Sequence, residues 1–188
     1  MKKVLFSALA IACFTALYSF VPGIKTLVTD DYKVNTEHSK IDWVGSKKEG
    51  YHPGTFMLKS GNVNVENGRI TKGQFVIDMA NLKVTDKAGV KLEGHLKADD
   101  FFDVTKHPEA IFEIENVNYT SETAVELTGT LTIKGIKVPI KFPGIVRGVS
   151  DKKLFAQAFF SLDSRLLPIT DKYAASDVQI MVYLYANK

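Results

Sequence analysis

The sequence predicts one mainly β domain, an antiparallel sandwich or barrel of roughly eight or nine strands with one inserted helix. Three observations lead to this fold class. Apolar and polar side chains alternate in many short runs, as in strands with one buried face. Turn residues such as Asn67-Gly68 separate the runs at short intervals. Helical spacing is persuasive in a single stretch, from Lys91 to Asp103, and Pro108 follows soon after it.

The expected strands follow one another from residue 41 to the end of the chain. The segments 155–162 and 178–185 are apolar on both faces, so they read as strands without a clear inward face. The alternating runs contain Ile41 and Trp43; Phe56 and Leu58; Val63 and Val65; Phe75, Ile77 and Met79; Phe112 and Ile114; Val125, Leu127, Leu131 and Ile133; and Val138, Ile140 and Phe142. The turns are expected at Ser60-Gly61-Asn62, Asn67-Gly68, Lys134-Gly135 and Pro143-Gly144.

The inserted helix is expected to present a stripe formed by Leu92, His95, Leu96 and Phe102. A second, short helical turn is expected at residues 170–175.

Composition and charge narrow the function classes. The chain has 188 residues, 24 Lys and Arg against 21 Asp and Glu, and a formal net charge of +3. Basic residues alternate with acidic ones, whereas nucleic-acid binding needs a concentrated basic face, so no nucleic-acid partner is expected. Cys13 is the only cysteine, and the sequence after it therefore contains no disulfide and no cysteine metal site.

The first 21 residues look like a targeting segment. Lys2 and Lys3 precede an apolar run that ends before Pro22-Gly23, which is the layout of a secretory signal peptide or an N-terminal membrane anchor. A lipoprotein signal at Cys13 is less favoured, because the run before it is short and the sequence stays apolar after it. Residues 22–31 read as a linker and residues 32–188 as the domain. We therefore expect a periplasmic or otherwise extracytoplasmic protein, and both a free and a membrane-anchored form are left open.

Residues that could carry chemistry do not form a recognisable catalytic or metal motif. The four histidines, at positions 38, 52, 95 and 107, lack metal-site spacing, and no nucleophile–base signature occurs. Asp99, Asp100 and Asp103 surround Phe101-Phe102, and they read as a structured turn whose two rings pack inward. No enzyme activity, cofactor or metal is expected.

The aromatic residues suggest a binding interior. Phe56, Phe75, Phe112, Phe142 and Phe159 are predicted to project from the strands into the interior. They could form a packed core or line a ligand tunnel, and strand alternation alone leaves both open.

One segment, HLKADDFFDVTKHPEAIF at residues 95–112, resembles the YceI-like family of polyisoprenoid-binding proteins. His38-Ser39, Trp43, the step from His52 to Gly54 and the strand at residues 75–79 support the resemblance, as does the ending from Asp177 onward. It covers residues 32–188. Ala98 stands where the family usually has serine, and residues 171–173 replace its usual Phe-Gly turn, which leaves the shape of one barrel end open.

The resemblance implies an extended, lipocalin-like antiparallel β-barrel of about eight strands. Its tunnel would bind and sequester or transport a long isoprenoid, an isoprenoid quinone, a fatty-acyl chain or another amphiphilic lipid. His52, His95 and Asp100 are candidates for the head group. A filled barrel serving as a structural, stress-related or interaction module is the alternative, and a lipid-modifying enzyme is less favoured. A homodimer and membrane association through the N-terminal segment are left open. The ligand-binding residues expected are Trp43, His52, Phe56, Leu58, Phe75, Ile77, His95, Leu96, Asp100, Phe101, Phe102, Phe112, Ile114, Leu131, Ile133, Phe142 and Phe159.

Overall fold

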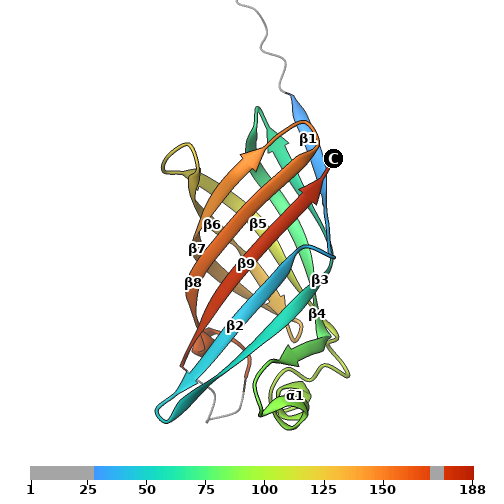
Figure 1. The fold of residues 1–188 in the computed structure, drawn as a ribbon, viewed down its shortest axis with the longest axis vertical. Helices are drawn as coiled ribbons and strands as arrows, with labels where there is room; N and C mark the ends of the chain where they lie inside the picture. Colours follow the sequence, from blue (N-terminus) through green and yellow to red (C-terminus); the bar gives the residue numbers. More distant parts are fainter. Residues whose placement is uncertain (1–27, 170–175) are drawn as a thin grey trace, which may run out of the picture.

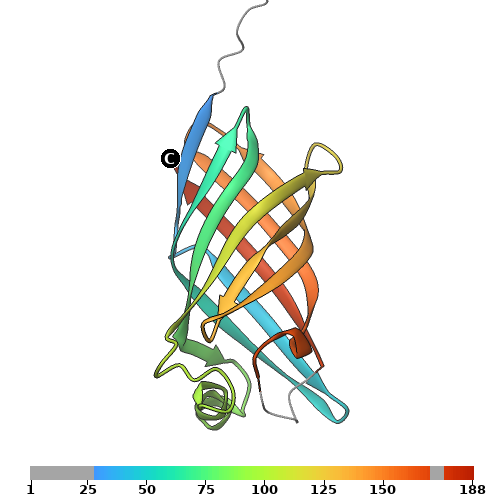
Figure 2. The same ribbon diagram turned by 180° about the vertical axis from the view of Figure 1, so that it is seen from behind.

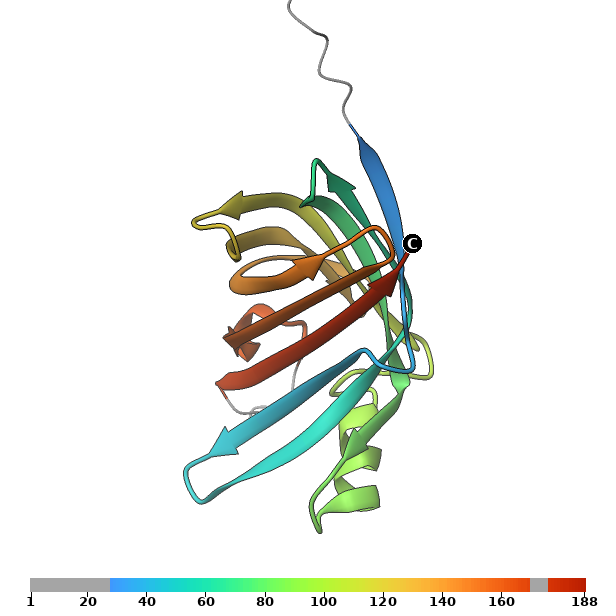
Figure 3. The same ribbon diagram turned by 45° about the horizontal axis from the view of Figure 1, so that its top comes forward.

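The strands wrap around a common interior in a computed structural model that describes residues 28–169 and 176–188 (Figures 1 and 3). All pairings between them are antiparallel. The elements are β1 (Thr29–Val34), β2 (Lys40–Lys47), β3 (Gly50–Glu66), β4 (Arg69–Val84), α1 (Gly89–Lys97), β5 (Glu109–Tyr119), β6 (Ala124–Ile133), β7 (Ile136–Val149), β8 (Lys153–Asp163), the 3-10 helix η1 (Ser164–Leu166) and β9 (Asp177–Asn187).

The sheet closes on itself because β3 pairs with β4 as well as with β2. The pairing then runs through β2, β9, β8, β7, β6 and β5 back to β4. Strands β1 and β2 share one place in this wall, since each pairs with β3 and β9 over a different part of their length. The predicted mainly β barrel with one inserted α-helix is confirmed, and closure gives every strand a partner on each side over at least part of its length.

A buried serine bridges the interruption between β1 and β2. Ser39 is fully buried, and its Oγ donates a hydrogen bond to the carbonyl of Tyr185 at 3.0 Å and accepts one from the Tyr185 N–H at 2.9 Å. The N–H of Asn35 also donates to the Tyr185 carbonyl, at 2.8 Å. A side chain thus replaces ladder bonds where the backbone turns, which keeps this part of the wall continuous.

Two of the four expected turns are correct. Asn67 and Gly68, and likewise Lys134 and Gly135, have positive φ angles and connect neighbouring strands as two-residue hairpin turns. The turn expected at residues 60–62 is wrong, because these residues lie inside β3. The turn expected at Pro143-Gly144 is also wrong, because it lies inside β7.

Those two misassigned glycines serve close packing instead of chain reversal. A Cβ on Gly61 would lie 2.8 Å from a methyl group of Val34 and 2.9 Å from a backbone oxygen. A Cβ on Gly144 would lie 2.8 Å from Leu127 Cδ1. Glycine within a strand often marks such close approach.

The inserted helix is shorter than expected. It spans Gly89–Lys97, so Phe102 lies beyond it, in the turn that leads to β5. Ala98 ends the helix in an extended conformation, and its carbonyl accepts from the N–H groups of Phe101 and Asp103. The predicted helical turn at residues 170–175 lies outside the described residues. Within the described part of the chain, no helix is long and apolar enough to cross a membrane.

Candidate functional site

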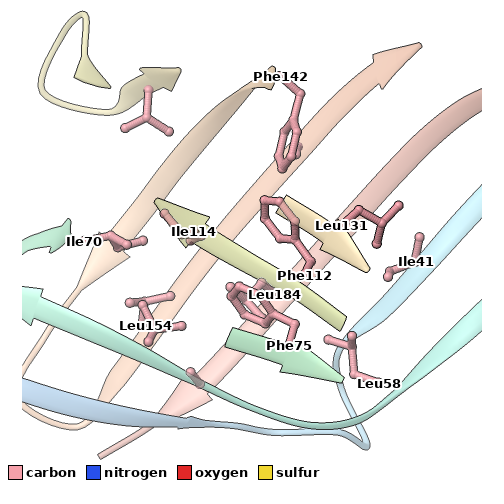
Figure 4. Packing of buried hydrophobic residues seen from close by; sticks show 14 of the residues in the cluster. Ile41, Leu58, Ile70, Phe75, Phe112, Ile114, Leu131, Phe142, Leu154 and Leu184 are labelled. Atoms are coloured by element: carbon pink, nitrogen blue, oxygen red, sulfur yellow. The ribbon is translucent and has the colours of Figure 1, made fainter. Parts of the chain in front are cut away.

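The barrel encloses a cavity of about 310 Å³, which lies within the range of about 300–1,000 Å³ typical of ligand pockets. Side chains from neighbouring strands point into it, among them those of Phe75 of β4, Phe112 of β5 and Leu131 of β6 (Figure 4). Of the residues expected at the ligand, the cavity is lined by Trp43, His52, Phe56, Leu58, Phe75, Ile77, His95, Leu96, Phe101, Phe102, Phe112, Ile114, Leu131, Ile133 and Phe142.

Two of the expected site residues lie elsewhere. The side chain of Phe159 is 64% exposed on the outer face of β8, so the prediction that it projects into the interior is wrong. Its neighbour Phe160 lines the cavity instead. The register of β8 was misjudged by one residue, which exchanges the two faces of a strand. Asp100 is exposed and does not line the cavity.

Several lining residues were missed by the sequence analysis. They include Phe160 and Leu162 of β8 and Ile180, Val182 and Leu184 of β9. Both strands are apolar on two faces, so alternation gave no signal for their inward residues. In the structure, a ring contact identifies the inward residue of β8, since Phe160 stacks on Phe142 with ring centroids 4.3 Å apart.

Aromatic rings line up along the interior from β4 to β8. The ring centroids of Phe75 and Phe112 are 6.2 Å apart, and those of Phe112 and Phe142 are 5.4 Å apart. The ring of Phe112 lies over Gly129, where an added Cβ would come within 2.7 Å of ring atom Cε2. The glycine provides the space for the ring, so it sets how far that ring extends toward the cavity.

One end of the barrel is sealed by side chains. Tyr32, Val65 and Leu154 are each at most 1% exposed and do not line the cavity. Val63 is equally buried but belongs to the cavity lining. The Tyr32 hydroxyl donates a 2.6 Å hydrogen bond to the carbonyl of Ser150, in the connection between β7 and β8. This is the end at which β1 and the C-terminus lie in Figure 1, opposite α1.

The other end carries three polar residues of the cavity lining, whereas Gln157 lines the cavity from the middle of β8. Lys47, His52 and His95 lie there, near the β2–β3 hairpin and α1, and we refer to this end as the mouth. A second apolar cluster packs beside the mouth and contains Trp43, Leu82, Val84, Leu96 and Phe101. It joins α1 and the turn after it to the barrel wall.

A hydrogen bond between His52 and Asp86 fixes the start of this helical segment to β3. His52 Nδ1 lies 2.8 Å from Asp86 Oδ2, and Asp86 Oδ1 accepts a 3.0 Å hydrogen bond from the N–H of Ala88. The hydrogen bond from His52 lowers the pKa of Asp86 below its usual value, and the backbone N–H of Ala88 acts in the same direction. Asp86 therefore remains a carboxylate at neutral pH and holds the segment before α1 against the mouth.

The turn at residues 99–103 holds two aromatic rings against the barrel. Phe101 and Phe102 meet edge to face with centroids 4.7 Å apart, and Phe102 also meets Phe56 at 6.1 Å. Asp103, with φ of 48°, pairs with Lys106 at 3.0 Å, which lowers the pKa of Asp103. The prediction that both rings pack inward is confirmed, and the turn is a structural element of the mouth.

Trp43 is the only tryptophan of the chain and lies at the level of Gly54 across the β2–β3 ladder. A Cβ on Gly54 would come within 2.2 Å of the indole, which therefore depends on this glycine. Among the described residues, Trp43 Nε1 is buried without a hydrogen-bond partner. A buried donor without an acceptor costs about 1–3 kcal/mol, so an oxygen atom brought by a ligand would relieve that cost.

The described residues contain no group of three or more histidine, cysteine, aspartate or glutamate residues placed to hold a metal ion. The arrangement offers an apolar channel with a sealed end, a ring-lined middle and a polar mouth.

Comparisons with known proteins agree with this architecture. The chain is 28% identical to a UPF0312 protein of Pseudomonas putida (strain W619) over 151 residues, which cover 79% of this chain and 75% of the relative. A UPF0312 protein of Pseudomonas fluorescens (strain SBW25) is 29% identical over 151 residues, 79% of this chain and 74% of the relative.

Among solved structures, Burkholderia cenocepacia BcnA aligns with a TM-score of 0.69 at 22% identity, covering 81% of this chain and 99% of that one. A polyisoprenoid binding domain from Saccharophagus degradans aligns with a TM-score of 0.63 at 13% identity, covering 83% and 97%. At these identities the two structures show a shared fold. The YceI-like domain family matches residues 32–184, and the chain therefore belongs to the YceI-like family.

Proposed function

We propose that the protein binds a long-chain amphiphilic lipid inside its barrel, outside the cytoplasm, and sequesters or transports it without changing it chemically. The observation that carries this proposal is the channel itself, which is sealed at one end, lined by apolar groups and polar at its mouth. An isoprenoid, isoprenoid quinone or fatty-acyl chain has the matching division into a long tail and a polar head.

The tail would lie along the aromatic and aliphatic lining. Each CH₂ group moved from water into such an environment gains about 0.8 kcal/mol. Several such groups are needed before the gain exceeds the cost of immobilising the ligand, which favours long chains over short ones. Leu131, Phe112 and Phe142 are the lining residues at the middle of this path.

The head would lie at the mouth, near His52, His95 and Lys47. These side chains offer hydrogen bonds and, at Lys47, a positive charge close to solvent. Trp43 adds a buried donor on the apolar side of the mouth. These polar groups lie together at one end of the channel, an arrangement that serves to orient a bound amphiphile. The polyisoprenoid binding domain from Saccharophagus degradans, which has the same fold, gives the ligand class further support.

Native mass spectrometry of the full chain, followed by organic extraction, tests the proposal. We expect an added mass that is released on denaturation and contains a long apolar chain. If the protein arrives without ligand, it should take up geranylgeraniol or a long fatty acid when either is added. If the protein carries no lipid and takes up neither of the added lipids, the proposed function is refuted, and a barrel that serves another purpose is favoured.

Localisation needs its own measurement. A fusion of the first 31 residues to alkaline phosphatase, which is active only after export, should give active phosphatase. The same fusion with an acidic residue in place of Leu5 and Phe6 should not, because charges interrupt the apolar run. An inactive fusion with the unaltered segment would contradict export.

A further inference from the structure

The barrel wall is not hydrogen-bonded over its full height between β7 and β8. Strand β7 pairs with β6 from Ile136 onward, but it pairs with β8 only from Gly144 to Val149. Residues 159–163 of β8 pair with β9 alone. Among the described residues, the wall therefore lacks a ladder between residues 136–143 and residues 159–163. In Figure 2, the lower part of β7 runs to the β6–β7 turn, whereas β8 runs to η1.

Two prolines occupy this unpaired edge. The two-residue turn at Lys134-Gly135 makes Ile133 and Ile136 a hydrogen-bonded pair, so the pairs that follow alternate. Pro139 and Pro143 consequently fall at positions whose backbone groups point away from β6 and toward β8. Proline has no N–H, so neither position can donate a ladder bond to β8, and only its carbonyl could accept one. The pairing with β8 stops next to Pro143, which makes the interruption a property of the sequence.

Side chains close the gap on its inner face. Phe142 of β7 and Phe160 of β8 stack across it, with ring centroids 4.3 Å apart and ring planes inclined by 12°. Ile140 and Leu162, from the same two edges, also line the cavity. On the outer face, Phe159 is exposed at the same level. A gap closed by stacked rings opens by side-chain rotation, whereas opening a hydrogen-bonded ladder requires several backbone bonds to break together.

The two ends of the barrel offer a harder path to an apolar chain. One end is filled by buried side chains, including Tyr32 and Leu154. At the mouth, a chain must pass polar groups and the cluster of Trp43 with the α1 segment, which the pair of His52 and Asp86 holds in place. Between β7 and β8, in contrast, the inner face of the gap carries only apolar side chains, and on the outer face Phe159 lies beside the exposed Lys141 and Ser161.

We propose that the gap between β7 and β8 is a lateral passage through which the apolar chain of the ligand enters and leaves the barrel. Phe142 and Phe160 form its inner closure, and Pro139 and Pro143 keep β7 and β8 from forming a continuous hydrogen-bonded ladder. This inference rests on the proposed lipid-binding function, and it adds the route by which a long chain reaches a channel that is sealed at one end.

The first test widens the passage. In Phe160→Ala, the stack is lost, and the association rate of cis-parinaric acid should rise about tenfold because the closure no longer has to rotate away. The matched control is Phe75→Ala, which removes a lining ring on the other side of the cavity. Loss of a lining contact alone should speed dissociation and leave association unchanged. Stopped-flow fluorescence with full-length protein measures both rates.

The second test closes the passage. Continuing the register past Gly144 and Ala158 sets Lys141 opposite Ser161, and both side chains are exposed. Bridging cysteines at these two positions with dibromobimane should slow both association and dissociation about tenfold. The control bridge joins cysteines at Lys141 and Thr128, which face each other in the hydrogen-bonded β6–β7 ladder. It should leave both rates at the wild-type value; Cys13→Ser is present in all these proteins.

The outcomes separate the two proposals. Wild-type association rates in both Phe160→Ala and the Lys141–Ser161 bridged protein would overturn the lateral passage and leave lipid binding intact. A wild-type protein that binds neither cis-parinaric acid nor geranylgeraniol would overturn the proposed function itself.

Discussion

Two leucines of the barrel allow the channel to be distinguished from a filled core. Leu154, at the sealed end, is 1% exposed and lies outside the cavity lining, whereas Leu131 lines the cavity. A Leu→Ala change in a packed site removes buried methyl groups and leaves a hole, which together cost about 3–5 kcal/mol. At Leu131 the change only enlarges an existing space, so the cost should be near the transfer contribution of about 2 kcal/mol.

Urea unfolding of both variants measures this difference. Leu154→Ala should lower the midpoint more than Leu131→Ala, with unchanged dependence on urea concentration. Binding of a long-chain ligand should show the opposite order. Leu131→Ala removes ligand contacts and should weaken affinity about tenfold, or about 1.4 kcal/mol, while Leu154→Ala should leave affinity unchanged.

The same pair of variants provides the refuting result. If both substitutions lower the free energy of unfolding by about 4 kcal/mol and neither alters ligand binding, then Leu131 is packed on all sides and the interior is a core. A further check is that ligand at 100 times its dissociation constant should stabilise the wild-type protein by about 2.7 kcal/mol.

Three further predictions follow from the geometry. Gly54→Ala should destabilise the protein by about 1–3 kcal/mol in thermal or urea unfolding, because the added Cβ would lie 2.3 Å from a backbone oxygen. The control is Gly50→Ala on the same strand, where an added Cβ would have no atom within 4 Å and should have little effect on stability. Equal losses of stability in the two variants would contradict the close packing at Gly54. The lowered pKa of Asp86 means that its carboxylate, hydrogen-bonded to His52, stabilises the fold above pH 3.8 and ceases to do so as pH falls through that lowered value. The stability advantage of wild type over Asp86→Asn should therefore shrink in acid, and a difference independent of pH would argue against the pair. Phe159→Ser should leave the amount of ligand bound unchanged in native mass spectrometry, and a loss of capacity would place that ring inside.

The predictable part of the fold is the part in which one physical rule acts alone. In β6, Val125, Leu131 and Ile133 alternate with polar residues, and all three are buried in the structure. The pairs Asn67-Gly68 and Lys134-Gly135 form turns because their backbone needs positive φ. Gly61 and Gly144 lie in sequences that resemble those turns, but in the structure they allow the close approach of a neighbouring side chain. That neighbour belongs to another strand, so the sequence around each glycine does not reveal it.

The same reasoning explains which part of the site could be predicted. Alternation and the family resemblance identify the walls, and most expected residues line the cavity. They fail at Phe159 and Phe160, because β8 is apolar on both faces and its register depends on the pairing with β9. The position of Asp100 was inferred from a motif, and its exposed side chain shows that a shared motif fixes the chain path of a turn more closely than the direction of each side chain in it.

Pro139 and Pro143 show how far a local rule extends. The turn at Lys134-Gly135 and the strand parity that it fixes already place both prolines with their missing N–H groups facing away from β6. Local chemistry therefore forbids two ladder bonds on that edge, but whether this leaves a gap depends on which strand lies alongside and on what its side chains do. In this barrel the neighbour is β8, and Phe160 meets Phe142 where backbone bonds are absent. The wall is consequently held there by the same kind of apolar contact that the channel offers to a ligand chain, so a chain that replaces one ring contact with another can pass without breaking the barrel.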